Sequence, residues 1–236
     1  MPHASMPEAL SAATVRPTGA QTAASQIYRA LRDSILTMQL VPGATLSEQE
    51  TAARLSVSRT PVREAFIRLS RERMLIVSPQ RRTAVAKIDL NRVRQEQFLR
   101  EAIEIAVVEQ FIRHAGEADY AALEACLTHQ REAVAAGDFP AFLRHDDDFH
   151  HQLYTATGND LAAQAVRRNC FDYQRLRSLS AADAPTQRLN LTQHEALLAH
   201  LRHGDLPASQ SLLREHLRRL FEEIPAMREK HPAYFA

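Results

Sequence analysis

The segment from Ser58 to Phe66, SRTPVREAF, constrains the fold of this chain more than any other part of it. Ser58 is a typical helix N-cap residue, expected to accept a hydrogen bond from a free N–H of the first turn. Pro61 falls inside that turn, where its missing N–H costs little. An apolar face at helical spacing follows, formed by Val62, Ala65, Phe66 and Leu69. The segment therefore predicts a helix over 58–71 that packs one face on a core.

Two arginines lie on a different face of this predicted helix. Arg59 and Arg63 are four residues apart, so both guanidinium groups are expected to point outward together. Forked donors near a capped helix N-terminus suit phosphates and guanine edges, with Ser58 and Thr60 assisting at phosphates. The alternative is that the two arginines only solvate the helix. The pattern favours a protein that reads DNA and regulates rather than catalyses.

The neighbouring residues complete a winged helix-turn-helix pattern. A helix is predicted over 25–40, ended by Pro42-Gly43, and a second over 47–55, joined by Ser56-Val57 to the arginine-bearing helix. Two apolar runs, 75–77 and 84–86, then bracket a polar turn and predict a β-hairpin wing. Arg81 and Arg82 fall at the tip of this wing, where they suit phosphate contacts.

Charge is distributed unevenly along the chain. Residues 1–88 contain 12 Lys and Arg against 6 Asp and Glu, a net charge of +6, and the remainder contains 17 against 22, a net charge of −5. A basic front half indicates an anionic partner such as nucleic acid.

Composition narrows the class of protein further. Residues 1–24 are rich in Ala, Ser, Thr and Pro without an apolar run, and we interpret them as a disordered tail rather than a signal peptide. No run of about eighteen apolar residues occurs, so neither a transmembrane helix nor a membrane partner is expected. Cys126 and Cys170 are isolated, as in a protein of the reducing cytoplasm.

Residues 89–230 have an almost wholly helical pattern. The predicted fold class is therefore mainly α, a winged helix-turn-helix over 25–88 followed by an antiparallel helical bundle. Breaks are predicted at Gly116, Gly137-Asp138, Gly158-Asn159, Ala184-Pro185 and Gly204-Asp205. The predicted bundle helices span 89–114, 117–136, 138–156, 159–181, 186–203 and 205–229.

Polar residues interrupt the apolar stripes of three bundle helices. Asp146 and His150 lie four apart in one stripe, His194 lies in another and His216 in a third. An ionisable group that faces a core is costly unless it is paired or bound to a metal. For any single histidine a hydrogen-bonded core position is the simpler interpretation, but the four together indicate a divalent metal site. Nitrogen ligands favour Zn or Ni, while Mn and Fe are also compatible.

The front half resembles the winged helix-turn-helix of the GntR family of bacterial repressors. The resemblance covers residues 25–88 and rests on PGATLSEQETAARLSVSRTPVREAFIRL, with VSRTPVREA as its most specific part. It implies DNA contacts from the recognition helix, the wing and the helix before the turn. Two positions depart from the family pattern: Gln49 stands where relatives often carry a DNA-contacting Arg, and Arg82 where they usually carry a wing-tip Gly.

The back half is similar to the FCD effector domain of the FadR-type branch of that family, over residues 92–222. The resemblance rests on Arg100 with Glu104, Asp146-x-x-Phe149-His150, Gly158-Asn159, His194-Glu195 and His216-Leu217. It implies a helical bundle with a central cavity, where a small organic acid meets a metal held by Asp146, His150, His194 and His216. It also implies a homodimer on a pseudo-palindromic operator. Arg100 is placed to grip a carboxylate, or alternatively to form an ion pair, and Asn169 and Arg175 are further candidates for the cavity wall.

The sequence as a whole predicts a bacterial transcription regulator, a repressor whose operator binding is modulated by a carboxylate effector. Such modulation requires different effector affinities in the two states of the protein. A sensor of the metal itself, or a protein with a purely structural metal, is the first alternative. A metalloenzyme with an accessory DNA-binding module is the second, and no general-base or nucleophile motif accompanies the metal ligands to support it.

Overall fold

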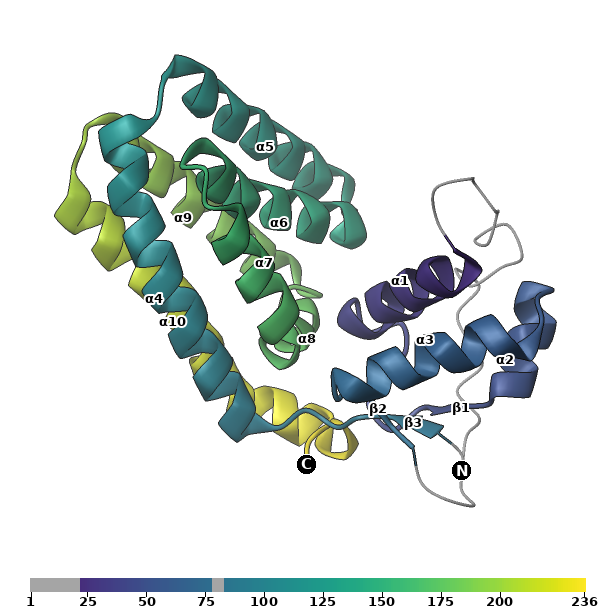
Figure 1. Cartoon of the computed structure of the whole chain (residues 1–236). Coiled ribbons are helices and arrows are strands. Elements are labelled where there is room, and N and C mark those ends of the chain that lie inside the picture. The colour runs from purple at the N-terminus through teal and green to yellow at the C-terminus, as the bar shows by residue number, and fades with distance from the viewer. Residues whose placement is uncertain (1–21, 78–82) are drawn as a thin grey trace. The chain divides into compact units, whose positions relative to one another are not determined.

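The computed structural model describes residues 22–77 and 83–236, which form two compact units (Figure 1). The first contains the described residues up to Asp89 together with Lys230–Ala236, and the second is Leu90–Glu229. Among the described residues, no helix combines the length and the apolar character that crossing a membrane requires. Most of the predicted tail, 1–24, lies outside the described residues, but Thr22 and the two alanines after it already begin the first helix.

The first unit is a three-helix domain with a small sheet. Its elements are α1 (Ala23–Leu36), β1 (Thr45–Leu46), α2 (Glu48–Leu55), α3 (Arg59–Arg71), β2 (Leu75–Ile76) and β3 (Thr83–Val85). The strands are antiparallel in the order β1-β3-β2, with Leu75 opposite Val85 and Thr45 opposite Ala84. The predicted wing hairpin is confirmed as β2 and β3. The third strand, β1, was not predicted because two residues are too few to show the alternation of apolar and polar side chains that marks a strand.

The first helix is shifted from its predicted span of 25–40. Thr22 is its N-cap, and its side chain accepts a hydrogen bond from the Ser25 N–H at 3.2 Å. The helix ends at Leu36 because Met38 adopts a positive φ of 60°, so the chain turns before Pro42-Gly43 is reached. The prediction that Pro42-Gly43 ends the helix was therefore wrong.

The DNA-reading segment folds as a helix whose predicted apolar face is confirmed. Val62, Ala65, Phe66 and Leu69 are all buried. Ser58 occupies the N-cap position, but the predicted capping hydrogen bond is absent from its side chain. An N-cap oxygen accepts from the N–H of the second or third helical residue, and the third residue here is Pro61, which has no N–H. The proline that suits the first turn thus removes one of the two donors for Ser58.

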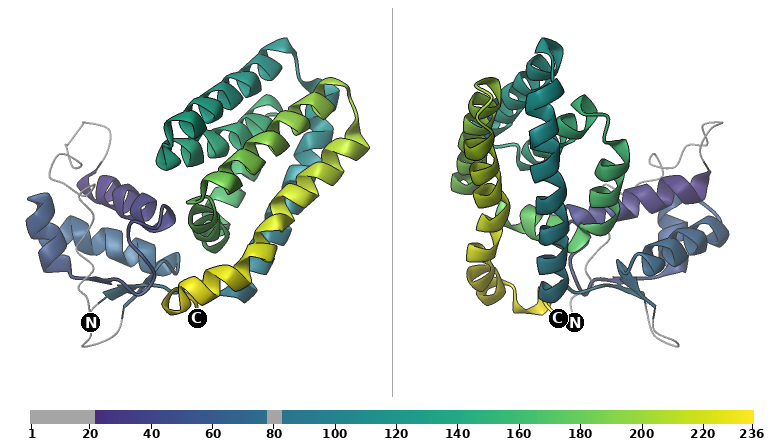
Figure 2. Two further views of the ribbon diagram at one scale, coloured as in Figure 1. Left: turned by 180° about the vertical axis from the view of Figure 1, so that it is seen from behind. Right: turned by 60° about the vertical axis from the view of Figure 1, so that its left-hand side comes forward.

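The second unit is an antiparallel bundle, as predicted (Figures 1 and 2). Its helices are α4 (Leu90–His114), α5 (Glu117–Ala136), α6 (Phe139–Ala156), α7 (Asp160–Asn169), α8 (Phe171–Ser180), α9 (Ala184–Arg202) and α10 (Leu206–Lys230). Residues from α4, α5, α6, α9 and α10 share one apolar core, at whose centre Phe111, Leu123, Phe149, Leu153 and Leu213 are fully buried. The long helices α4 and α10 run alongside each other and are tied by Arg218 Nε donating to Glu101 Oε2 at 2.7 Å (Figure 2).

The helix predicted over 159–181 is in fact two helices that meet at Cys170. The Cys170 backbone has φ −110°, ψ 43°, which ends α7 and begins α8. Glu96 of α4 accepts the Tyr173 N–H at 2.8 Å, and its backbone oxygen lies 3.4 Å from Cys170 Sγ. A carboxylate from another helix thus satisfies an N–H at the new helix start, which is a tertiary contact that the local sequence does not reveal.

Ala184-Pro185 begins a helix rather than separating two. Asp183 caps α9 by accepting the Thr186 N–H at 3.2 Å, and Pro185 lies in the first turn, where proline is favoured. The C-terminal residues after α10 return to the first unit. Ile88 and Phe235 form a parallel bridge, in which the Ile88 N–H donates to Tyr234 O at 2.9 Å and the Ala236 N–H to Ile88 O at 3.0 Å.

Candidate metal centre and DNA-binding helix

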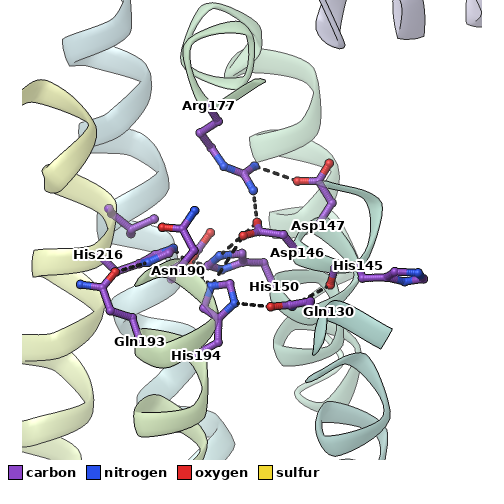
Figure 3. A network of polar contacts seen from close by, with 12 residues as sticks. Gln130, His145, Asp146, Asp147, His150, Arg177, Asn190, Gln193, His194 and His216 are labelled. Atoms are coloured by element: carbon purple, nitrogen blue, oxygen red, sulfur yellow. Dashed lines mark hydrogen bonds and ion pairs between the residues drawn. The ribbon is translucent and has the colours of Figure 1, made fainter. Parts of the chain in front are cut away.

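Three histidines from three helices of the second unit converge in its interior (Figure 3). His150 on α6 is 4% exposed, His194 on α9 is 1% exposed, and His216 on α10 is half-buried. Each offers one ring nitrogen, and these nitrogens all lie within 4.8 Å of one another. Helical periodicity predicted this convergence of three residues from separate parts of the chain, because each lies in the buried stripe of its own helix.

The second nitrogen of each ring, Nδ1, faces an oxygen acceptor. His150 Nδ1 lies 2.9 Å from Glu104 Oε2, His194 Nδ1 lies 3.0 Å from Gln130 Oε1, and His216 Nδ1 lies 2.9 Å from Gln193 Oε1. The amide nitrogens of both glutamines donate elsewhere, to His145 O and Glu215 Oε1, so their oxygens face the imidazoles. Because these oxygens only accept, each Nδ1 carries a proton, and each Nε2 of a neutral ring keeps a free lone pair.

In neutral rings protonated at Nδ1, the three Nε2 atoms carry no proton and cannot donate hydrogen bonds to one another. His194 Nε2 and His216 Nε2 are 3.3 Å apart, and His150 Nε2 is buried without a hydrogen-bond partner among the described residues. Lone pairs that face each other repel, and an unsatisfied buried acceptor costs about 1–3 kcal/mol. A divalent cation satisfies all three at once, and imidazole is a ligand that Zn and Ni accept well. The donor set therefore fits a metal.

Asp146, the predicted fourth ligand, lies beside the triad. Its Oδ2 is 3.9 Å from His150 Nε2 and its Oδ1 is 3.9 Å from His194 Nε2. Arg177 of α8 donates to Oδ2 of the same carboxylate and to Asp147 Oδ1 at 2.7 Å. Burial by itself raises the pKa of Asp146, but the nearby Arg177 and histidines lower it to about 2. Asp146 is therefore an ionised carboxylate, available to a cation at the triad.

Two of the histidines, His194 and His216, are held neutral, as metal ligation requires. Burial lowers the pKa of His194 to about 3, against the opposing effect of Asp146. Burial, followed by the neighbouring His194 and His150, holds the pKa of His216 well below its usual range. Neutral imidazole is the form that binds metals.

The low pKa of His194 makes the metal-free protein sensitive to acid. Between pH 6.5, the ordinary pKa of a histidine, and about pH 3, the lowered pKa of His194, the unfolded chain binds a proton at His194 that the folded chain does not. The free energy of unfolding is thus expected to fall as the pH decreases through this window. Urea unfolding at about pH 7 and about pH 5 measures this fall. A His194→Gln variant should show a smaller difference, and an equal difference would contradict the assignment.

A pocket opens beside the histidine triad. Polar groups from four helices line it: Asp146 of α6, Tyr173, Arg177 and Ser180 of α8, Asn190 of α9, and His216 and Arg219 of α10. Arg219 Nη2 donates to Asn190 Oδ1 at 2.6 Å, while its Nε is buried without a hydrogen-bond partner among the described residues. The pocket thus brings two guanidinium groups to one edge of the histidine triad.

The three predicted effector-binding residues do not line this pocket. Arg100 is 4% exposed, and its Nε donates to Glu104 Oε1 at 2.5 Å. Arg175 is also buried and pairs with Asp172, whereas Asn169 is exposed and donates to Ala165 O at 2.7 Å. For Arg100 the structure thus shows the ion pair that the sequence left as the alternative.

Arg177, Asn190 and Arg219 take their places on the pocket wall. Sequence reasoning missed Arg177 because one continuous helix over 159–181 was assumed. The break at Cys170 gives α8 a direction of its own. Tyr173 and Arg177, four residues apart on α8, therefore share a face and both line the pocket.

In the first unit, the predicted DNA-binding residues that the structure describes are all exposed. Gln49 lies on α2, Ser58 is the residue before α3, and Arg59, Thr60 and Arg63 lie on its first turns. The Arg59 side chain is 69% exposed and contacts Glu48 Oε2 at 3.4 Å, which tethers it only loosely. Arg81 and Arg82 lie outside the described residues.

Comparisons with known proteins agree with both halves of the chain. Residues 23–85 match the model of the gntR family of bacterial regulatory proteins, and residues 97–219 match the FCD domain. An HTH-type transcriptional regulator from an unstable DNA locus of Streptomyces ambofaciens is 33% identical over 93% of this chain and 92% of its own. The transcriptional repressor RspR of Escherichia coli K12 is 33% identical over 89% of this chain and 92% of its own.

Solved structures support the fold. Escherichia coli McbR/YncC superposes with a TM-score of 0.75 at 21% identity, covering 89% of this chain and 99% of that chain. A GntR regulator from Rhodococcus sp. RHA1 gives 0.73 at 23% identity, covering 86% and 97%. The relatives are transcriptional regulators rather than enzymes. The chain therefore belongs to the GntR family of bacterial regulatory proteins, as a DNA-binding transcriptional regulator whose helix-turn-helix is followed by an FCD domain.

Proposed function

We propose that the protein is a homodimeric repressor whose operator binding responds to a small carboxylate held beside a divalent metal in the helical unit. The convergence of three unprotonated Nε2 atoms, one of them without any partner among the described residues, carries the proposal. His150, His194 and His216 would hold the ion, with Asp146 as the fourth ligand, and Zn is the favoured occupant. When bound, the metal supplies a Lewis acid for an anionic oxygen.

The charge balance of the site supports an anionic effector. Asp146 is paired with Arg177 and Glu104 with Arg100, so these buried pairs are neutral, and imidazoles that bind a metal are uncharged. A divalent ion would thus leave about two uncompensated positive charges in a buried site, where isolated charge is costly. A carboxylate in the pocket offsets them, and Arg177 and Arg219 line that pocket.

For the DNA, two protomers would place their α3 helices in successive major grooves of a pseudo-palindromic operator. Arg59 and Arg63 would read bases or clamp phosphates, assisted by Gln49, Ser58 and Thr60. The predicted wing-tip residues Arg81 and Arg82 would add phosphate contacts. A carboxylate with higher affinity for the non-binding state would release the DNA by shifting the population.

A binding assay with the metal-loaded dimer tests this proposal. Fluorescence anisotropy at fixed salt follows an operator obtained by selection from genomic fragments, while mono-, di- and tricarboxylates are titrated. We expect at least one carboxylate to weaken operator binding, and Arg219→Gln to raise the concentration needed about tenfold or more, the loss of one charge-assisted contact. Arg214→Gln is the matched control, since Arg214 lies on the same helix, 42% exposed, outside the pocket lining.

The outcomes separate the alternatives. Operator binding that is lost on chelation and restored by metal, yet insensitive to every carboxylate, would instead support a metal sensor. A carboxylate response that survives full metal removal would contradict the proposed site.

A further inference from the structure

Helix α4 supplies none of the three histidines, yet it contacts the metal centre through one carboxylate. Glu104 Oε2 lies 2.9 Å from His150 Nδ1, and Glu104 is 1% exposed. Its other oxygen accepts from Arg100 Nε at 2.5 Å and from Tyr154 Oη at 3.3 Å. Both carboxylate oxygens are therefore held by buried donors on two helices.

This arrangement differs from that of the other two histidines. His194 and His216 donate their Nδ1 protons to neutral amide oxygens, whereas His150 donates to a carboxylate. A carboxylate acceptor fixes the ring orientation and makes the opposite nitrogen a stronger ligand. Burying such a charge is costly unless it is paired, and Arg100 supplies the pairing. Arg100 thus keeps Glu104 ionised and in place as the hydrogen-bond acceptor for His150, a role beyond stabilising the fold.

We propose that Glu104 is a positioning residue for the metal ligand His150, and that Arg100 serves to hold this carboxylate in place instead of binding the effector. The inference rests on the metal site of the proposed function. Its consequence is that an ion bound by α6, α9 and α10 also fixes α4, the helix that begins directly after Asp89, where the first unit ends.

Titration with Co²⁺ tests the role of Glu104 against a matched pair on the same helix. The test variant is Arg100→Met/Glu104→Gln, which removes both charges so that neither is left unpaired. The control is Glu109→Gln/Arg113→Met, because Glu109 and Arg113 form an i,i+4 ion pair on the same helix and the Arg113 side chain is 63% exposed. We expect the test variant to bind Co²⁺ about 10- to 100-fold more weakly than the wild type. The control should retain wild-type affinity.

A spectroscopic measurement on the wild-type protein does not depend on how the Arg100→Met/Glu104→Gln variant folds. In the Zn-loaded, histidine-labelled dimer we expect three exchange-protected Nδ1 protons, with that of His150 furthest downfield because its acceptor is charged. The resonance is assigned by its loss in His150→Ala. A His150 proton that coincides with those of His194 and His216 would overturn the proposal.

The two failures are distinguishable. If the wild type binds Co²⁺ and the test variant binds it equally well, the role of Glu104 is contradicted while the metal site stands. If the wild type itself binds no Co²⁺, both the site and the inference fall.

Discussion

Replacing Arg63 by Ala is expected to weaken operator binding by about 1–3 kcal/mol per half-site, roughly 5- to 150-fold. Arg63 is exposed on the second turn of α3, beside the face that buries Val62 and Phe66. Its guanidinium is free to enter a major groove, where a bidentate contact to guanine is the commonest specific interaction of arginine. Fluorescence anisotropy at one fixed salt concentration measures the change.

Arg71→Ala provides the matched control, because Arg71 is an exposed arginine at the last residue of the same helix. It should have a much smaller effect than Arg63→Ala. The salt dependence adds a second readout: loss of a phosphate contact reduces the salt slope by about one, whereas loss of a base contact changes sequence preference. Operator binding by Arg63→Ala that equals that of the wild type would remove α3 as the recognition helix.

Removing the metal is expected to lower the thermal stability of the protein substantially. An ion present at about 1,000 times its dissociation constant stabilises the folded state by about 4 kcal/mol. For a protein of this size that corresponds to a change in melting temperature on the order of 10 °C. The physical reason is local, since chelation leaves the Nε2 atoms of His194 and His216 facing each other at 3.3 Å. Calorimetry before and after chelation, and after Zn²⁺ is restored, measures the effect.

A neighbouring histidine offers a control for this experiment. His151 follows His150 on α6 but is exposed, so His151→Ala should keep the full metal-dependent change in melting temperature. His194→Ala should abolish it. A melting temperature that does not respond to chelation in the wild type would contradict the metal assignment.

The sequence predicted the centre of the site but not its surroundings, and the reason is physical. His150, His194 and His216 were found because each interrupts an apolar stripe, which is a property of its own helix. Gln130 and Gln193 hold two of these rings only after the helices pack, and no local pattern marks them.

Where a helix begins and ends depends partly on distant residues. Glu96 accepts an N–H at the start of α8, so the α7–α8 break, and with it the pocket position of Arg177, depends on a residue more than seventy positions away. Local chemistry predicted what was local: the spacing of Val62, Ala65, Phe66 and Leu69 gave the buried face of α3 correctly.

The proposed regulator requires one divalent ion held by the histidine triad with Asp146. Elemental analysis of the purified wild type, compared with His150→Ala prepared identically, measures whether that ion is bound. We expect about one equivalent of metal, most of it Zn, per wild-type chain and far less in the variant, because the variant lacks one of the three converging Nε2 ligands. Equal metal content in the two proteins would contradict the site.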